Sequence, residues 1–238
     1  MTWDGWSRTQ TTRTLYELHQ QCAQTACPKH PDLAYDLIGT HSEIVAQIAV
    51  ALSEFEGELA EDDANLLVEG ALAHDIGTYS VLRADAFDDS AEGHVFQRET
   101  YIQHGLRGYQ LLLERGLSQD VALFARNHTG VGLTRADCAR QKLPIPCDDY
   151  VPGTRLQELV TLADKFHTKS VPAQFVSPQT ARSRCEKFGE QNLARWDALS
   201  ARCCSSHAGA GRMDSTSRTE AIERIISRLA QQYGMSIL

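Results

Sequence analysis

The stretch EDDANLLVEGALAHDIG, residues 61–77, carries the pattern on which the fold prediction rests. Residues at three- and four-residue spacing share one face of an α-helix, and here that face consists of Leu67, Gly70, Ala71 and His74. An imidazole therefore lies on an otherwise apolar face, and the carboxylate of Asp75 follows it directly. Gly77 is typical of a helix end. We expect a helix over about residues 61–75 that directs two ionisable groups into the protein.

The same pattern recurs outward from this stretch. Other segments with helical spacing each place one ionisable side chain on an apolar stripe: His41, His104, His128 and Asp164. A buried charge is costly unless it is paired or bound to a metal ion, and no inward Lys or Arg is evident near these groups. Imidazole and carboxylate ligands suit Fe, Mn, Zn, Co or Ni. The six side chains together predict a site for one or two divalent metal ions.

Helical periodicity continues through most of the chain, without strand alternation or an internal repeat, so we predict an all-α fold. Residues 1–30 are expected to form a polar arm with one short helix, and residues 31–204 the core with its flanking helices. Residues 205–214 have the small, flexible composition of a linker, and residues 215–238 are expected to form a final helix. The stretch 78–98 is loop-like, and whether it forms a lid is left open.

Three local expectations concern helix ends. The spacing predicts a helix from about residue 155 to 169. Ser177-Pro178 combines a cap with proline in the first turn, which predicts a helix that extends to Cys204. Ser217-x-x-Glu220 is similar to a capping box and would open the last helix.

The composition is that of a globular protein without a basic surface. The chain has 238 residues, 42% of them hydrophobic, and a formal net charge of −8, which argues against general nucleic-acid binding. Its densest apolar stretch is too short for a membrane span, and its N-terminus lacks the features of a secretory signal. The seven cysteines include no Cys-x-x-Cys pair. We expect a cytoplasmic protein with reduced thiols; homo-oligomerisation is left open.

The order His41, His74-Asp75, Asp164, with the local text Ala73-His74-Asp75-Ile76-Gly77, resembles the HD-domain metal-dependent phosphohydrolase superfamily in its HD-Ile-Gly variant. The resemblance covers roughly residues 33–200 and implies a helical bundle, here with additional C-terminal helices. Two further segments are similar to those that carry the extra histidines of dinuclear members: His104-Gly105-x-x-Gly108 and His128-Thr129-Gly130. Two others are similar to a bacterial and archaeal subgroup known only as phosphohydrolases: Ala163-Asp164-Lys165-Phe166 and Lys187-Phe188-Gly189.

The resemblance also implies a mechanism. A first metal ion would be held by His41, His74, Asp75 and Asp164, and a second by His104 and His128 with Asp75 bridging. A metal-activated water would then attack phosphorus in a small phosphate ester or nucleotide, so that Asp75, His104 and His128 are the catalytic candidates. With a single ion, both of these histidines would be available to bind phosphate or to protonate the leaving oxygen.

The phosphate itself needs cations, and here the chain departs from many relatives. Many relatives carry Lys directly after the motif, where this chain has Thr78. The Gly-Tyr-Pro loop of cyclic-di-GMP phosphodiesterases is also absent, which argues against cleavage of cyclic-di-GMP. Phosphate contacts must therefore come from elsewhere. The candidates are two pairs of cations that follow Asp164 or cluster further on: Lys165 with Lys169, and Arg182 with Lys187.

Three alternatives stay open. The His-Thr-Gly text at residues 128–130 is also similar to the HD family that splits diadenosine tetraphosphate symmetrically. The same six ligand types occur in HD proteins with a mixed-valent di-iron centre, such as myo-inositol oxygenase, which cleave C–H, C–C or C–P bonds with dioxygen. A non-catalytic binding module is the third alternative, and the intact ligand set argues against it. Metal content, oxygen uptake and phosphate release separate these readings.

Overall fold

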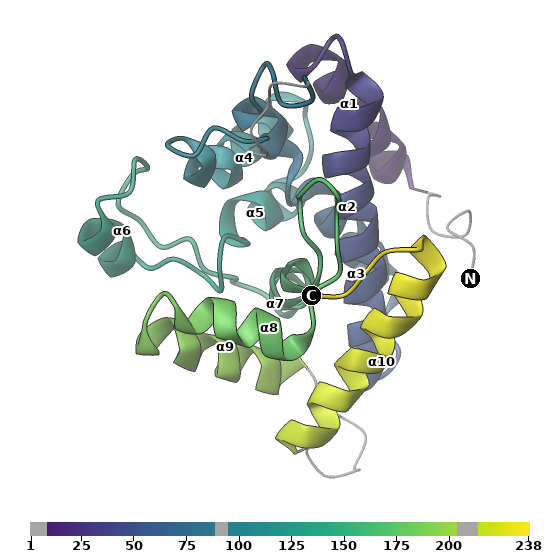
Figure 1. Ribbon diagram of the computed structural model, residues 1–238, viewed down its shortest axis with the longest axis vertical. Helices are drawn as coiled ribbons and strands as arrows, with labels where there is room; N and C mark the ends of the chain where they lie inside the picture. The colour runs from purple at the N-terminus through teal and green to yellow at the C-terminus, as the bar shows by residue number, and fades with distance from the viewer. Residues whose placement is uncertain (1–8, 89–94, 204–213) are drawn as a thin grey trace.

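The structure is a computed structural model that describes residues 9–88, 95–203 and 214–238. In these ranges the chain is all-α, as expected, with only isolated β-bridges outside its helices. Figure 1 shows the α-helices: α1 (Gln10–Ala26), α2 (Pro31–Ser53), α3 (Glu61–Ala73), α4 (His104–Glu114), α5 (Gln119–Asn127), α6 (Arg135–Gln141), α7 (Arg155–Ala163), α8 (Pro178–Glu186), α9 (Glu190–Cys203) and α10 (Ser215–Tyr233). Short 3-10 helices adjoin them: η2 (Glu54–Glu56), η3 (Ile76–Val81), η4 (Tyr101–Gln103) and η5 (Asp164–Phe166). None of the helices in the described ranges combines the length and apolarity that a membrane crossing requires.

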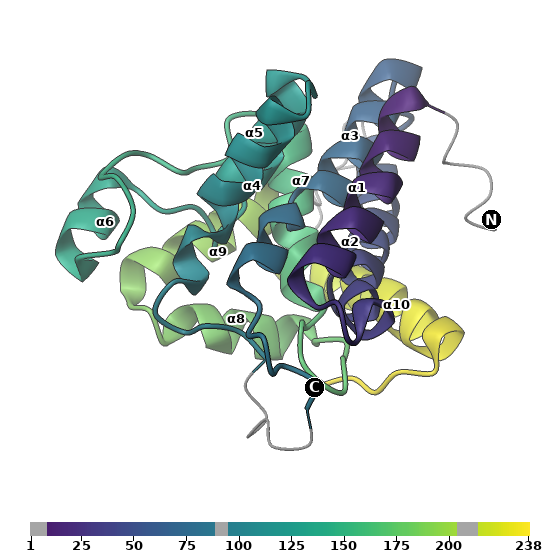
Figure 2. The same ribbon diagram turned by 90° about the horizontal axis from the view of Figure 1, so that it is seen from above.

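Helix α2 packs against α1, α3, α7 and α10 and contributes to two apolar clusters. Figures 1 and 2 show it beside α1 and α3. Its first half, with Leu37 and Ile38, packs with α1, α3 and α5 in one cluster. Its second half, with Ile48 and Leu52, packs with α7, α8, α9 and α10 in the other. His41 lies between the two halves and is fully buried. Because α3 and α5 also contribute to both clusters, the clusters meet along a seam, and the predicted ionisable side chains lie in this seam.

The end of α7 differs from the expectation in a way that matters for the site. The helix ends at Ala163 rather than near residue 169, because the chain turns through η5 and becomes extended at His167, with φ −142° and ψ 144°. His167 then forms a β-bridge with Phe175. Residues 167–169 therefore turn away from the axis of α7 instead of continuing along it.

Two other helix boundaries also differ. The helix expected from Ser177 to Cys204 is divided into α8 and α9 by Gly189, whose φ of +100° lies in the left-handed region that favours glycine. The last helix begins at Ser215 with a different cap from the one expected, because the Asp214 side chain accepts a hydrogen bond from the Ser217 N–H. Ser217 is therefore inside α10 and is not its cap.

The predicted N-terminal arm contains a longer helix than expected. α1 has 17 residues and buries Leu15, Leu18 and Ala23 against α2 and α3. Residues 205–213 of the predicted linker lie outside the described residues, as does part of the stretch 78–98. The linker, the division into domains and the lid therefore stay predictions.

The turn after His74-Asp75 is packed so closely that only glycine fits at residue 77. A methyl group added to Gly77 would lie 2.0 Å from the carbonyl oxygen of His104 and 2.4 Å from the nitrogen of Gly108. Both are backbone atoms of α4, which cannot rotate away as a flexible side chain can. The Ile-Gly of the motif thus lets η3 touch the first turn of α4 and brings His104 next to the end of α3.

We expect Gly77→Ala to lower the free energy of unfolding by about 3 kcal/mol, at the upper end of the usual cost of overpacking. Denaturant unfolding followed by circular dichroism measures the change. Gly153→Ala is the matched control, since its added methyl group would meet only Oε1 of Gln157 at 3.8 Å. Equal stability of the two variants would contradict the close packing of η3 on α4.

Candidate metal centre

The six predicted ligands come together in the seam between the two apolar clusters. They lie at the ends of α3, α4, α5 and α7 and in the middle of α2: His74, Asp75, His104, His128, Asp164 and His41. At the end of α3 the backbone leaves helical geometry at Asp75, with φ −110° and ψ 11°, so that this side chain and its neighbour both reach the same centre. All six side chains are buried, with at most 8% of the residue surface exposed, so their charges are poorly solvated.

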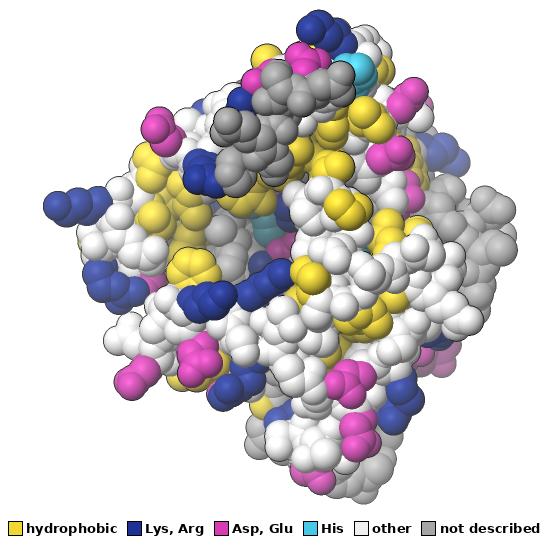
Figure 3. Space-filling model, in the orientation of Figure 1, with side chains coloured by type: hydrophobic (Ala, Val, Ile, Leu, Met, Phe, Trp, Pro, Cys, Tyr) yellow, Lys and Arg dark blue, Asp and Glu magenta, His cyan; other side chains and the backbone are white. Residues whose placement is uncertain are grey.

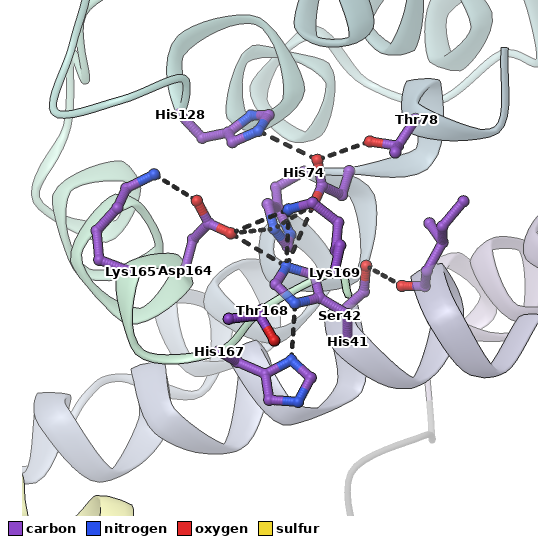
Figure 4. A network of polar contacts seen from close by, with 12 residues as sticks. His41, Ser42, His74, Thr78, His128, Asp164, Lys165, His167, Thr168 and Lys169 are labelled. Atoms are coloured by element: carbon purple, nitrogen blue, oxygen red, sulfur yellow. Dashed lines mark hydrogen bonds and ion pairs between the residues drawn. The ribbon is translucent and has the colours of Figure 1, made fainter. Parts of the chain in front are cut away.

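The first ligand group consists of His41, His74, Asp75 and Asp164, whose candidate ligand atoms all lie within 4.8 Å of one another. Nε2 of His41 is 3.0 Å from Oδ1 of Asp164 and 3.2 Å from Oδ2 of Asp75. Nε2 of His74 is 3.4 Å from Oδ2 of Asp75 and 3.5 Å from Oδ1 of Asp164. Two ring nitrogens thus face two carboxylates in a small buried space (Figure 4), the mixture of ligands that suits a divalent transition metal.

The second ligand group consists of Asp75, His104 and His128 and shares Asp75 with the first. Oδ1 of Asp75 lies 3.3 Å from Nε2 of His128 and 3.6 Å from Nε2 of His104, and the two nitrogens are 3.0 Å apart. Each ring donates from Nδ1 to a backbone carbonyl, that of Ala125 or Tyr101. A neutral ring then has no proton on Nε2, so two lone pairs and a carboxylate face one another. A shared cation removes this repulsion, and the group therefore fits a metal ion.

The first group shows the same arrangement at His74. Its Nδ1 donates to the carbonyl of Ala71 at 2.6 Å, and its buried Nε2 has no hydrogen-bond partner among the described residues. The buried Oδ2 of Asp75 also lacks a hydrogen bond there, and its contacts are ionic, with Lys169 among them. Buried polar atoms without a hydrogen bond are rare in folded proteins. Their position between the other ligand atoms is therefore a second observation that fits a metal ion.

Two neighbours orient the ligands. The hydroxyl of Thr78 donates to Oδ1 of Asp75 at 2.9 Å, which fixes the rotation of the carboxylate shared by both groups. Nδ1 of His41 lies 2.9 Å from Nδ1 of His167, which holds the His41 ring with Nε2 toward the carboxylates. Such partners set the direction and basicity of metal ligands.

Two lysines neutralise the carboxylates, contrary to the expectation that no inward cation lies near them. The ammonium of Lys169 contacts Oδ2 of Asp75 and lies 3.4 Å from Oδ1 of Asp164 and 3.2 Å from Nε2 of His41. Lys165 contacts the other oxygen of Asp164. Lys169 can reach this position because the chain turns after α7 instead of continuing as a helix. It contacts the same atoms that a metal ion would bind.

These charges outweigh burial in setting the pKa values of the carboxylates. Burial would raise the pKa of Asp75, but Lys169 and His74 hold it well below its usual range. Burial acts in the same way on Asp164, whose pKa is lowered by Lys165 and Lys169. Both carboxyl groups are therefore ionised, the form in which they bind metals.

The imidazoles divide into two kinds. Burial, with the repulsion of His128, lowers the pKa of His104 to about 3, and burial also lowers the pKa of His128. Burial would lower the pKa of His74 as well, but Asp75 and Asp164 outweigh it and raise the value to about 9. The imidazoles of His104 and His128 are thus already neutral, whereas His74 must release a proton when a metal ion binds.

A cavity of about 550 Å³ reaches the site at Asp164, which lines it together with Lys165 and Lys169. Its size is within the usual range of roughly 300–1,000 Å³ for small-molecule sites. Figure 3 shows it as a hollow with a histidine on its floor and Lys or Arg side chains along its lower edge. Asp164, Lys165 and Lys169 lie at its base, α6 forms one wall, and α8 and α9 form the other. The buried carboxylate of Asp137 joins the two walls, because it pairs with Arg195 of α9 at 2.9 Å as well as with an arginine of α6.

Only two of the four predicted phosphate contacts reach this cavity. Lys165 and Lys169 line it, whereas Arg182 is exposed outside it and forms two hydrogen bonds of 2.9 Å with Asp197. Lys187 borders a different hollow. Arg182 and Lys187 therefore lie outside the cavity that the other two cations line.

Other cavity residues were missed by reasoning from charge alone. One face of α8, continued past its end, lines the cavity with Ala181, Arg184, Cys185 and Phe188. The signal was present in the sequence, because Ala181 and Cys185 are the buried apolar residues of that helix at four-residue spacing. Arg184, the cation next to this stripe, lines the cavity, whereas the predicted pair Arg182 and Lys187 does not.

Comparison with known proteins agrees with this arrangement. The HD domain family model matches residues 38–169, which include all six ligands. The uncharacterized protein MJ0778 of Methanocaldococcus jannaschii is 33% identical over 140 residues, which cover 55% of this chain and 71% of that protein. The tRNA (cytidine(56)-2'-O)-methyltransferase of Picrophilus torridus is 29% identical over 133 residues, 56% of this chain and 32% of that enzyme. The match thus spans about a third of the methyltransferase.

A solved structure resembles the fold. The HD domain of the L. monocytogenes phosphodiesterase PgpH in complex with cyclic-di-AMP has a TM-score of 0.51 and 15% identity, and the match covers 90% of this chain and 97% of that chain. This likeness supports the all-α bundle.

Proposed function

Because this chain belongs to the HD-domain family, we propose that it is a metal-dependent phosphohydrolase that cleaves a small phosphate ester or nucleotide. The observation that carries the proposal is the pair of buried ligand groups that share Asp75, next to a cavity that is lined by Asp164 and by cationic side chains. Buried carboxylates and imidazoles with unpartnered atoms fit a divalent metal ion.

Each part of the site has a proposed role. One ion would be held by His41, His74, Asp75 and Asp164, and a second by Asp75, His104 and His128. When bound, a divalent metal lowers the pKa of a water molecule and so supplies a nucleophile near neutral pH. Lys165 and Lys169 would bind oxygens of the reacting phosphate. If one ion binds, His104 or His128 would have to take up a proton, against its lowered pKa, before it could bind phosphate as a cation or protonate the leaving oxygen.

The substrate class follows from the cavity. Its walls combine cations with apolar side chains such as Ile102, Leu133 and Leu143, and these suit a ligand with both a phosphate and an apolar or planar part. The PgpH domain with cyclic-di-AMP bound shows a nucleotide on a related fold. We do not propose methyl transfer, because the similarity to the methyltransferase covers 32% of that enzyme.

The proposal is tested by metal content and phosphate release. Protein purified without oxygen and without added metal is expected to hold one or two transition-metal ions per chain by mass spectrometry. Phosphate release from a panel of nucleotides and phosphate esters, with Mn, Co, Ni, Zn or Fe, should disappear after chelation and return with metal. Protein that binds no metal even after reconstitution would contradict the proposal and favour a non-catalytic binding module.

A di-iron oxygenase is the second candidate, and the shared carboxylate of Asp75 is the observation that favours it. A carboxylate common to two ligand groups fits a dinuclear centre, and the ligand types do not separate the two reactions. Two irons per chain, oxygen uptake and no phosphate release would replace the phosphohydrolase with an oxygenase. About one Mn, Co, Ni or Zn per chain with phosphate release would exclude it.

A further inference from the structure

The cations that line the cavity differ in whether they are already paired. Lys165 and Lys169 contact the carboxylates of the ligand groups, and Arg140 and Arg195 both pair with Asp137. Arg184 has no hydrogen-bond or ion-pair partner among the residues that the structure describes. It is therefore the cavity cation that can bind an anionic group of a ligand without first breaking an internal pair.

The cations also follow an order from the base of the cavity to its rim. Lys169 lies between the carboxylates of both ligand groups. Lys165 contacts Asp164 and is also close enough to Cys185 of α8 to affect its thiol. Burial raises the pKa of this thiol, and the ammonium of Lys165 lowers it. Arg184, the neighbour of Cys185, lines both this cavity and the adjoining hollow, so it lies at the rim where the two meet.

An exposed aromatic ring follows Arg184 on the same side of the cavity. Phe188 comes four residues later, lines the cavity and is 71% exposed. A single exposed apolar side chain is common on protein surfaces, but this one lies on the cavity wall, where a bound ligand would cover it. Aromatic rings of this kind stack on nucleobases.

We propose that Arg184 binds a second phosphate of the substrate, next to the one that reacts, and that Phe188 stacks on its base. The inference rests on the proposed function. It names the substrate class as a nucleoside diphosphate or triphosphate, with its terminal phosphate at the metal ligands and its base toward the rim. Water would add to the terminal phosphorus, the bond to the bridging oxygen would break, and that oxygen would leave on the shortened nucleotide and take up a proton or remain as the anion.

The test compares binding of two probes to metal-loaded protein by calorimetry. One probe is AMP, and the other is an ADP analogue with a methylene group between its phosphates, which cannot be hydrolysed there. We expect the native protein to bind the analogue more tightly, and Arg184→Gln to weaken its binding by about 10- to 100-fold, the usual value of a charge-assisted hydrogen bond. AMP binding should change by less than about 3-fold, because its single phosphate lies at the base.

Arg182→Gln is the matched control, because it makes the same change two residues away on α8, outside the cavity. It should leave the binding of both probes unchanged. Unchanged binding of the analogue to Arg184→Gln, or equal losses for both probes, would overturn the second-phosphate assignment. A failure of the proposed function is distinguishable, since it would appear as absent phosphate release while the difference between the probes persists.

Discussion

Replacing Asp75 with Asn is expected to lower hydrolytic turnover by about 1,000-fold or more, since a bound metal contributes several kcal/mol to the transition state. Asp75 is the ligand that the two groups share among the described residues. Asparagine keeps the size of the side chain but removes its charge and replaces one carboxylate oxygen with an N–H₂ group, which has no lone pair for a metal ion. Metal content should therefore fall together with activity, as measured by mass spectrometry and phosphate release.

Two further variants sharpen this prediction. Asp197→Asn makes the same chemical change on the exposed face of α9, where the carboxylate pairs with Arg182, and should keep native activity and metal content. His128→Gln alters the second ligand group alone. If two ions bind, it should lose one and keep the other. A folded Asp75→Asn protein with native metal content and turnover would remove Asp75 from the centre.

Lys169→Met is expected to destabilise the metal-free protein by about 3–5 kcal/mol, the usual cost of removing one partner of a buried ion pair. The ammonium contacts Asp75 and lies 3.4 Å from Asp164, so its loss leaves two buried carboxylates with less compensation. A divalent metal ion compensates the same oxygens. The metal-loaded variant should therefore unfold at nearly the native denaturant concentration.

Thermodynamic linkage turns this difference into a binding measurement. If the metal-free state is destabilised and the metal-bound state is not, the variant must bind metal more tightly, by tenfold for each 1.4 kcal/mol. Denaturant unfolding with and without metal, and a metal titration against a chelator, measure the two sides independently. Lys187→Met, on the part of the chain that does not line the cavity, should change neither. Equal destabilisation with and without metal would show that Lys169 is only a packing element.

The helices and the six side chains of the candidate metal centre could be predicted because both depend on local spacing. Apolar residues at three- and four-residue intervals identify a buried helical face, and a histidine or aspartate on that face is conspicuous because burial of its charge is costly. His41, His74 and Asp164 were found in this way, and the structure brings them together. The same reasoning identifies Gly77 as a helix end, but it does not explain why glycine is required there. The reason is the contact of η3 with the backbone of α4.

The cations could not be assigned in this way, because a charged side chain is stable on any solvated face. Arg182 and Lys187 were grouped by their charge and separation, yet Arg184 faces the cavity. Lys169 was expected on a continuous helix, yet the chain turns after Ala163 and the side chain reaches Asp75 instead. Neither outcome follows from the spacing of residues within one helix.

The sequence by itself determined the all-α fold and the kinds of group at the site, since helical periodicity and the cost of burial act over a few residues. Only the tertiary structure decided that Lys169 neutralises Asp75 and that Arg184 remains unpaired at the rim in the part of the chain described. These features depend on contacts between residues up to 128 positions apart, as between His41 and Lys169. Such contacts are set by how the helices pack, and the pattern of any one helix does not contain them.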